Sequence, residues 1–316
     1  MNHKQTVYGV DVSKAKLVVG RYDVEGLTKI DNTAEPIAAW LAGLPVGSIV
    51  AMEATGAYHR LLAQMAHAAG MVVFVLDPQA IKHYARAIGS RAKTDPCDAR
   101  LIARYVEHER AKLRVWQPPL PAADALSRLL VRRQALVNAS QKLAQSLSGL
   151  PALKASRKTL LASLKRMIGN VELLMRAELA RMPEMAALHR RLMSIVGIGF
   201  VVAAQLVAAL SALRFSRADA FIAYTGLDPR PDDSGTHRGR RRLTKHGPAL
   251  MRCLLYNAAM AATHSKLFKP LYTQLRARGL QSTEAIVILA RKLARIAFAL
   301  YKSGETFDVQ KHLKTT

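Results

Sequence analysis

Cysteine is scarce in this chain of 316 residues, which holds only Cys97 and Cys253. Two thiols are too few for a disulfide framework or for a zinc site made of cysteines. We therefore expect both to be buried or incidental, so the chemistry of the protein has to come from other side chains.

Long apolar runs are also missing. The longest candidate, residues 195–210, falls short of the roughly 18 residues that a membrane span needs, and Gly197, Gly199 and Gln205 interrupt it. The first residues lead directly into a strand pattern, without the apolar core or the cleavage site of a signal peptide. We expect a cytoplasmic protein with no membrane partner.

Acidic residues are the third shortage. The chain has 22 Asp and Glu against 47 Lys and Arg, which gives a formal net charge of +25. This excess favours a polyanionic partner, and nucleic acid fits it better than the main rival, an anionic membrane surface. Half of the residues are apolar, and the length allows two domains with cores of their own. We expect a folded, nucleoid-associated protein.

Residues 1–114 predict a mixed α/β domain. Segments rich in β-branched and aromatic residues predict strands, and segments with helical periodicity alternate with them. The predicted strands are 6–12, 17–23, 48–52 and 71–76, and the predicted helices are 34–43, 57–69, 79–87 and 95–108. The connection 13–16 is short enough to join the first two predicted strands as a hairpin. Antiparallel strands followed by alternating helices and strands indicate a mixed sheet.

Three prolines in residues 115–122 mark a boundary, and residues 115–183 predict a linker followed by a coiled-coil region. Apolar residues recur with heptad spacing on both sides of a break at 149–151. They are Leu129, Leu136 and Leu143, then Leu160, Leu164, Met167, Val171 and Leu174. Because neither run exceeds roughly three heptads, these helices either form an arm for dimerisation or pack one face on their own domain.

Residues 184–316 predict a mainly helical domain. The segment Val196-Gly197-Ile198-Gly199 has the glycine pair and the flanking aliphatic residues of a helix-hairpin-helix. The backbone amides of such a segment can meet a phosphate. A tight turn between two packed helices explains the same residues.

Four carboxylates stand out in a chain so poor in acids. Asp11 lies near the end of the first predicted strand, and Glu53 directly follows the strand 48–52. Strand ends of an α/β sheet are where side chains project into a crevice. Asp95 and Asp98 lie three residues apart at a helix start and so share one face. Together they predict a site for Mg²⁺, with Mn²⁺ as the alternative ion. Asp95 before Pro96 would also serve as a helix cap, and Asp98 would favour the helix dipole.

A basic segment follows in the helical domain. Ser234 lies beside Gly235 in a polar loop, next to a cluster suited to phosphate contacts. The cluster consists of Arg238, Arg240, Arg241, Arg242 and Lys245. The Ser234 hydroxyl is a candidate nucleophile, although Ser-Gly is also ordinary turn composition. Thr236, Tyr224 and Thr225 are the rivals.

In their order along the chain, these motifs resemble one known family, the DEDD transposases of insertion sequences mobilised with a bridge RNA, which are related to the pilin-gene invertases. The resemblance runs nearly end to end. It rests on Gly-Val-Asp-Val-Ser-Lys at 9–14, Glu-Ala-Thr-Gly at 53–56, Lys-Thr-Asp-Pro-Cys-Asp-Ala at 93–99, Val-Gly-Ile-Gly at 196–199, Tyr-Thr-Gly-Leu-Asp-Pro-Arg at 224–230, Ser-Gly at 234–235 and Thr-Lys-His-Gly at 244–247. The departure is the loop at 232–242, which is rich in charge.

The resemblance implies a RuvC-like fold of the ribonuclease H type for the first domain, with Asp11, Glu53, Asp95 and Asp98 as metal ligands. It implies that Ser234 attacks a DNA phosphodiester and forms a transient phosphoserine. It also implies a coiled coil between the domains and a homodimer or homotetramer in which the serine domain of one subunit completes the metal site of another. A structured RNA would pair with donor and target DNA, so that base pairing rather than the protein selects sequence.

The sequence thus favours a transposase that cuts and rejoins DNA through Ser234. A structure-selective nuclease of the Holliday-junction type, with the same carboxylates and water as nucleophile, is the alternative. A third hypothesis is a non-catalytic DNA-binding protein whose acidic residues only cap helices and stabilise the sheet.

Overall fold

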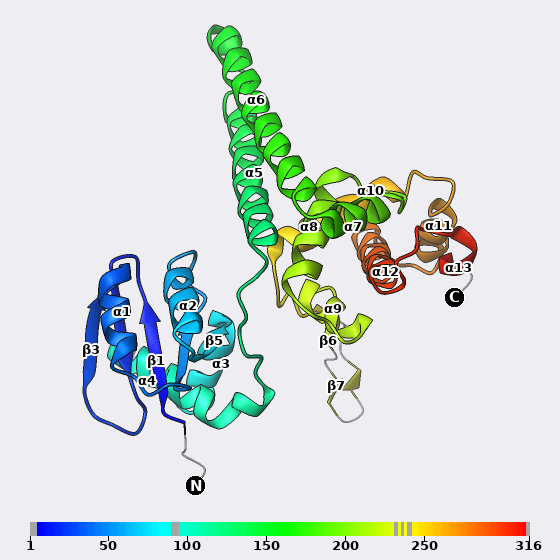
Figure 1. Ribbon diagram of the computed structural model, residues 1–316. Coiled ribbons are helices and arrows are strands. Elements are labelled where there is room, and N and C mark those ends of the chain that lie inside the picture. The colour runs from blue at the N-terminus through cyan, green and yellow to red at the C-terminus, as the bar shows by residue number, and fades with distance from the viewer. Residues whose placement is uncertain (1–4, 90–94, 231–232, 235–236, 239–241, 314–316) are drawn as a thin grey trace. The chain divides into compact units, whose positions relative to one another are not determined.

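The computed structural model describes residues 5–89, 95–230, 233–234, 237–238 and 242–313. It contains two compact units, Met1–Pro118 and Pro119–Thr316 (Figure 1). Unit 1 is built on a mixed β-sheet and unit 2 is mainly helical, which confirms the predicted succession of an α/β domain and a helical one.

The sheet of unit 1 has five strands in the order β3-β2-β1-β4-β5. The strands are β1 (Val7–Val12), β2 (Lys16–Gly20), β3 (Leu27–Asp31), β4 (Ile49–Glu53) and β5 (Val72–Leu76). β1, β2 and β3 pair antiparallel, while β4 runs parallel to both β1 and β5. The predicted hairpin and mixed sheet are confirmed. β3 was not predicted, because its residues are mostly exposed and carry no apolar alternation.

Helices cover both faces of this sheet. The helices are α1 (Ala34–Ala42), α2 (His59–Ala68), α3 (Pro78–Ala87) and α4 (Asp95–Glu109), and a 3₁₀ turn, η1 (Arg110–Lys112), follows them. One face forms a core with α1 and α2, in which Leu62 packs near Val10 and Met52. The other face forms a core with α3 and α4, in which Ile102 packs near Ile49. Alternating side chains of β1, β4 and β5 therefore enter different cores.

The segment 113–118, which ends at the first proline of the predicted boundary, belongs to unit 1 by its contacts. The Trp116 backbone nitrogen donates to the Val73 carbonyl oxygen over 2.7 Å, and the Trp116 side chain packs on the core beneath α2. His67 and Gln117 form a side-chain hydrogen bond of 3.2 Å. The segment thus extends the side of the sheet that β5 borders.

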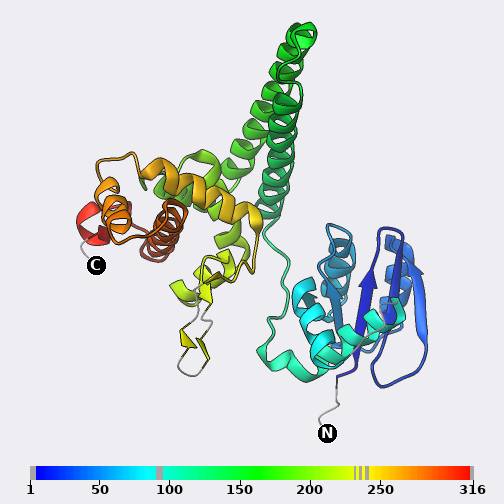
Figure 2. The same cartoon turned by 180° about the vertical axis from the view of Figure 1, so that it is seen from behind.

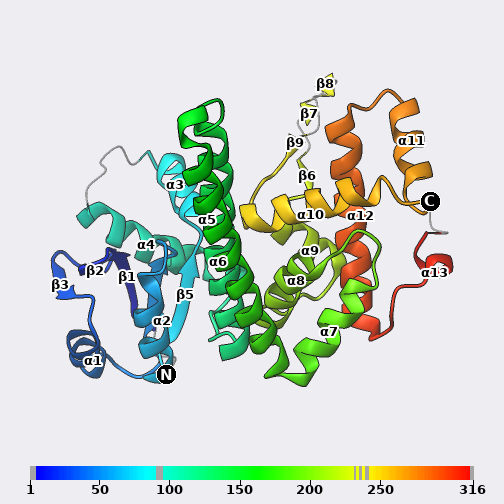
Figure 3. The ribbon, with the colours of Figure 1, turned by 90° about the horizontal axis from the view of Figure 1, so that it is seen from above.

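Unit 2 begins with two long helices, α5 (Pro121–Ser146) and α6 (Lys154–Ala180), joined through the 3₁₀ turn η2 (Pro151–Leu153). They lie side by side in each view (Figures 1, 2 and 3), and an ion pair of 2.7 Å between Arg133 and Glu172 links them. Of the predicted heptad residues in α6, Leu164 and Val171 are half-buried, but three others remain exposed. These are Leu160 at 41 %, Met167 at 51 % and Leu174 at 56 %. A coiled coil with another chain therefore stays a prediction.

Further helices complete unit 2, and the residues of α8 from Ala203 to Leu210 are all buried. The apolar run noted in the sequence is thus a core helix, and no helix in the described ranges could span a membrane. The helices are α7 (Pro183–Met193), α8 (Phe200–Ala212), α9 (Ala218–Thr225), α10 (Ala249–Ala262), α11 (Lys269–Ala277), α12 (Ser282–Ser303) and α13 (Val309–Leu313). Between α9 and α10, β6 (Pro229–Arg230) pairs with β9 (Arg242–Leu243), and β7 (Asp233–Ser234) pairs with β8 (His237–Arg238).

Candidate active site

Asp11 and Glu53 occupy neighbouring positions on two parallel strands. The last paired residues of β1 and β4 are Val10 and Met52, so the next position along each strand sets Asp11 beside Glu53. Paired strands lie about 4.8 Å apart. Because Val10 and Met52 enter the core beneath α1 and α2, Asp11 and Glu53 project to the opposite face, where α3 and α4 pack.

Helix α4 brings Asp98 to this same face because it packs very close to β1. A Cβ atom on Gly9 would lie 2.0 Å from the Ala99 carbonyl oxygen and 2.5 Å from the Ala103 nitrogen. Only glycine admits the helix at this distance. Gly9 precedes Asp11 by two residues on the same face, and Asp98 precedes Ala99 in the first turns of α4. The close contact thus holds both carboxylates in the same part of the unit.

The electrostatic environment of Glu53 links these acids. Burial is the largest cause that raises the pKa of Glu53, and the negative charges of Asp11, Asp98 and Asp77 raise it further. A side-chain hydrogen bond with Thr55 acts in the opposite direction. Acids that repel one another at a partly buried site favour a neutralising cation, and carboxylate oxygens are the ligands that Mg²⁺ prefers. The donor set therefore fits a divalent metal ion.

The described side chains do not include all of the predicted metal ligands. Asp95 begins α4, as the Asp-Pro signal predicts, but its side chain lies outside the described part of the chain. Among the side chains that are described, no three His, Cys, Asp or Glu come together closely enough to hold a metal ion. Asp11, Glu53 and Asp98 are thus electrostatic neighbours, and their coordination of a metal ion stays a prediction.

Asp77 is an acidic neighbour that the sequence reasoning missed. It directly follows β5, and its Oδ1 accepts a hydrogen bond of 2.9 Å from the Gln79 backbone nitrogen at the start of α3. The capping role explains its presence, and its charge still reaches Glu53. The sequence could have revealed Asp77, because this acid directly follows the predicted strand 71–76, just as Glu53 follows the predicted strand 48–52.

Asn32, also missed, connects the two loops that leave the carboxylate strands. Its Nδ2 donates to the Ser13 carbonyl oxygen at 2.9 Å and to the Tyr58 carbonyl oxygen at 3.1 Å. Ser13 follows the end of β1, and Tyr58 lies in the loop between β4 and α2. Asn32 therefore fixes the spacing of the loops next to Asp11 and Glu53. It comes directly after β3, the strand that the sequence did not reveal.

The loop of Ser234 is described only in part. The backbone of Ser234 pairs with His237 between β7 and β8. The side chains of Ser234 and Arg238 lie outside the described residues, as do Thr236, Arg240 and Arg241. Arg242 and Lys245 are exposed at the base of the loop. The predicted nucleophile is therefore placed in strand β7, and its catalytic role stays a prediction.

Two rival nucleophiles have structural roles instead. Thr225 is fully buried, and its hydroxyl donates to the Ile222 carbonyl oxygen at 2.7 Å while it accepts from the Leu227 nitrogen at 3.3 Å. Burial raises the pKa of Tyr224, so its phenol resists the ionisation that a nucleophile needs. Both residues support the end of α9 from which the Ser234 loop departs.

The two glycines between α7 and α8 differ in what surrounds them. Gly197 has a φ of +93°, and a Cβ atom there would lie 2.6 Å from the Ala258 carbonyl oxygen of α10. Gly199 caps α8 with ordinary extended backbone, and a Cβ atom there would meet nothing within 4 Å among the described residues. Helix packing thus explains Gly197, whereas phosphate binding at Gly199 stays a prediction.

Comparison with known proteins decides the family. A family model described as "Transposase IS116/IS110/IS902 family" matches residues 189–273, and a DEDD transposase model of the same group, described as "Transposase", matches residues 8–154. The chain is a transposase of the IS110 family. The first match includes Ser234 and the basic loop, and the second includes the four predicted metal ligands.

Curated relatives of the transposase agree with this assignment. It is 26 % identical over 270 residues to the pilin gene-inverting proteins of Moraxella lacunata and Moraxella bovis, covering 83 % of this chain and 82 % of each relative. It is 27 % identical over 342 residues to the transposase for insertion sequence element IS1111A of Coxiella burnetii (strain RSA 493 / Nine Mile phase I), covering 95 % and 91 %. These matches confirm a DEDD transposase related to pilin gene-inverting proteins, and a DEDD domain implies a divalent metal.

The raised pKa of Glu53 predicts how the stability of the metal-free transposase depends on pH. The folded protein holds the Glu53 proton more tightly than the unfolded chain, in which the pKa has its ordinary value of 4.5. Since the folded state binds more protons, the free energy of unfolding should fall as the pH rises from that value through the raised pKa. Denaturant titrations in chelator at several pH values should show a weaker fall for Glu53→Gln. Parallel curves for the two proteins would contradict this expectation.

Proposed function

We propose that this transposase cuts and rejoins DNA strands at a Mg²⁺ site held by Asp11, Glu53, Asp95 and Asp98, with Ser234 as the nucleophile. The observation that supports it most is the position of Asp11 beside Glu53, one residue past the last pair of β1 and β4, on the face of the sheet where the helix that carries Asp98 packs. Mn²⁺ would bind to the same carboxylate oxygens.

The chemistry needs one bond to form as another breaks. Bound Mg²⁺ would polarise the scissile phosphate and offset its charge. The Ser234 hydroxyl oxygen bonds to phosphorus while the bond from phosphorus to one sugar oxygen breaks; the serine gives up its proton and the departing sugar oxygen takes one up. A sugar hydroxyl of another strand then attacks the phosphoserine, which frees the serine and joins the strands. Phosphodiester bonds are exchanged, so no further reactant is required.

The partners of the proposed reaction are donor and target DNA, with a bridge RNA that selects both. Arg238, Arg240, Arg241, Arg242 and Lys245 would contact phosphates beside Ser234, and the exposure of Arg242 and Lys245 is consistent with that role. A homodimer or homotetramer would bring the serine domain, residues 184–316, of one subunit to the carboxylate domain, residues 1–114, of another. The exposed heptad residues of the region 115–183 offer a surface for this assembly.

Replacement of Ser234 tests the covalent step. Wild-type protein with Mg²⁺ and labelled DNA carrying its element ends should yield a protein–DNA species that survives denaturing electrophoresis. Ser234→Ala should yield none, because alanine has no oxygen to bond to phosphorus. Ser216→Ala, an exposed serine of the same unit, is the matched control and should form the adduct normally.

The alternative nuclease gives a different result in the same experiment. If Ser234→Ala cleaves the DNA as fast as wild type and no adduct forms with either protein, water is the nucleophile and the serine proposal is wrong. If Asp11→Asn and Asp98→Asn cleave normally in Mg²⁺, the metal-site proposal is wrong.

A further inference from the structure

The outward face of α12 forms a basic groove with α13 that lies apart from the residues discussed above. The groove has a volume of about 440 Å³. Four cationic side chains line it, together with the apolar surface of Ile288 and Ile296. The cations are Arg291, Lys292, Arg295 and Lys311, and the name α12–α13 groove is used for these six residues.

The sequence of α12 produces this face directly. Ile288, Arg291, Lys292 and Arg295 follow one another at steps of three, one and three residues, which keeps them on one side of a helix. The opposite side is the main apolar contribution of α12 to the core of unit 2, with Leu289 and Leu293 among its fully buried residues. The helix is therefore anchored by one face and presents the cationic one to its surroundings.

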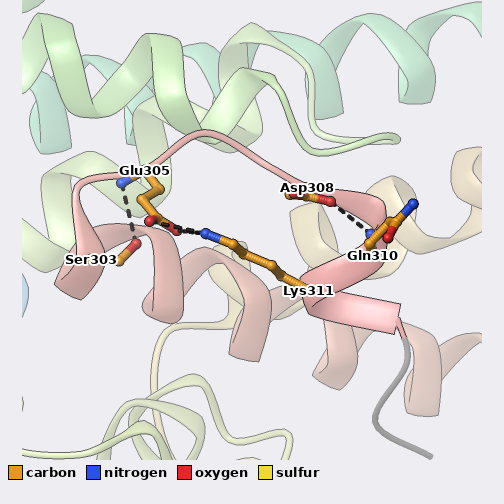
Figure 4. A network of polar contacts seen from close by, with 5 residues as sticks. All are labelled: Ser303, Glu305, Asp308, Gln310 and Lys311. Atoms are coloured by element: carbon orange, nitrogen blue, oxygen red, sulfur yellow. Dashed lines mark hydrogen bonds and ion pairs between the residues drawn. The ribbon is translucent and has the colours of Figure 1, made fainter.

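Two of the four cations are already neutralised. Arg295 pairs with Asp219 of α9, and Lys311 pairs with Glu305 at 3.0 Å; Figure 4 shows the second pair, with Lys311 extended from α13 toward Glu305. Arg291 and Lys292 have no ion pair with any described residue. The groove thus keeps the two positive charges of Arg291 and Lys292, which no described acid compensates.

Arg291 has a further unmet requirement. Its Nε is buried and has no hydrogen-bond partner among the described residues. A buried donor without an acceptor destabilises the fold, and the cost is larger when the group is charged. A phosphate bound at Arg291 would supply the missing acceptor, because the planar guanidinium presents Nε and Nη side by side to two phosphate oxygens.

We propose that the α12–α13 groove binds a phosphodiester segment of nucleic acid, with Arg291 and Lys292 as the contacting residues. The exposed apolar surface of Ile288 suits the sugar carbons that flank each phosphate, and the volume exceeds what a bare phosphate needs. The groove is thus a second nucleic-acid site of the transposase. It depends on neither Ser234 nor the carboxylates.

A charge-neutralising double variant tests the groove in the full-length protein. Arg291→Gln/Lys292→Gln is compared with Lys266→Gln/Arg278→Gln, which removes the same two charges at exposed positions of unit 2 outside the groove. Fluorescence anisotropy measures the affinity for labelled duplex DNA and for a labelled structured RNA at several salt concentrations. Thermal unfolding of all three proteins checks that the variants fold.

The groove variant should bind nucleic acid about ten- to thirtyfold more weakly near physiological salt, and the slope of log affinity against log salt should shrink by about 1 to 2. The control variant should keep the slope of the wild type. A loss on the DNA, on the RNA or on both supports the proposal and identifies the nucleic acid that occupies the groove. Wild-type affinity and slope on both ligands, or an equal loss in the control, would overturn it.

The catalytic proposal is separable in the same assay. Ser234→Ala should bind with the wild-type salt slope while it forms no adduct, because the groove is intact. A groove variant that binds normally therefore leaves the serine mechanism standing, and a failure of the serine mechanism leaves the groove standing.

Discussion

Glu53→Gln is expected to lower Mg²⁺-dependent strand cleavage by about 10²–10⁴-fold, because metal stabilisation of the transition state is worth several kcal/mol and each ~1.4 kcal/mol is a factor of ten. Glutamine keeps the size of the side chain but removes the charge beside Asp11. Cleavage of labelled DNA at saturating Mg²⁺ measures the loss. Glu25→Gln, an exposed acid of the same unit, is the control and should cleave normally.

The same substitution should raise the melting temperature of the metal-free protein. The pKa of Glu53 is raised by burial and by the charges of Asp11, Asp98 and Asp77, so the ionised side chain destabilises the fold at neutral pH. Mg²⁺ should stabilise the wild type more than the variant, since a ligand that binds only the folded state raises stability. If Glu53 had a purely structural role, its replacement would lower both the cleavage activity and the stability. An unchanged melting temperature in chelator, with cleavage intact, would contradict the site.

Gly9→Ala is expected to lower the free energy of unfolding of unit 1 by about 3 kcal/mol or more, because it overpacks the contact between β1 and α4. The new methyl group would meet the backbone of Ala99 and Ala103, so α4 has to move and Asp98 with it. Denaturant titration measures the stability, and the cleavage assay should show a loss beyond what the unfolded fraction explains.

A second glycine provides the control for Gly9. Gly169 lies in α6, where a Cβ atom would meet nothing within 4 Å among the described residues, so Gly169→Ala should stabilise the helix by about 0.5–1 kcal/mol. Adding Ala103→Gly to Gly9→Ala should not restore stability, because the clash is with backbone atoms. A Gly9→Ala protein as stable as wild type would show that α4 can shift at little cost.

The carboxylate pair could be predicted from the sequence because its signal is local. A charged residue at the end of an apolar strand is visible in a short window, and this pattern gave both Asp11 and Glu53. Asp77 follows a strand in the same way, but Asp77-Pro78 also begins a helix, and that role alone accounts for the residue. Gly9 inside a strand was a readable sign of close backbone approach.

Other features depended on contacts that no short window contains. β3 is held by backbone pairing with β2, and its side chains are mostly exposed, so its residues have no apolar pattern to detect. Asn32 acts through carbonyl groups of two loops that are distant in sequence. Heptad spacing predicted the helices α5 and α6, but it could not tell which apolar residues their packing would leave exposed.

The register between β1 and β4 makes the carboxylate pair a measure of correct folding. Neighbouring residues of a strand point to opposite faces, so a slip of β4 by one residue would turn Glu53 toward the α1 and α2 side, away from Asp11. Such a molecule would retain a sheet and much of its apolar burial but would separate the two acids. A chain with this wrong register would not cut DNA, and strand cleavage would be confined to molecules whose sheet has the correct register.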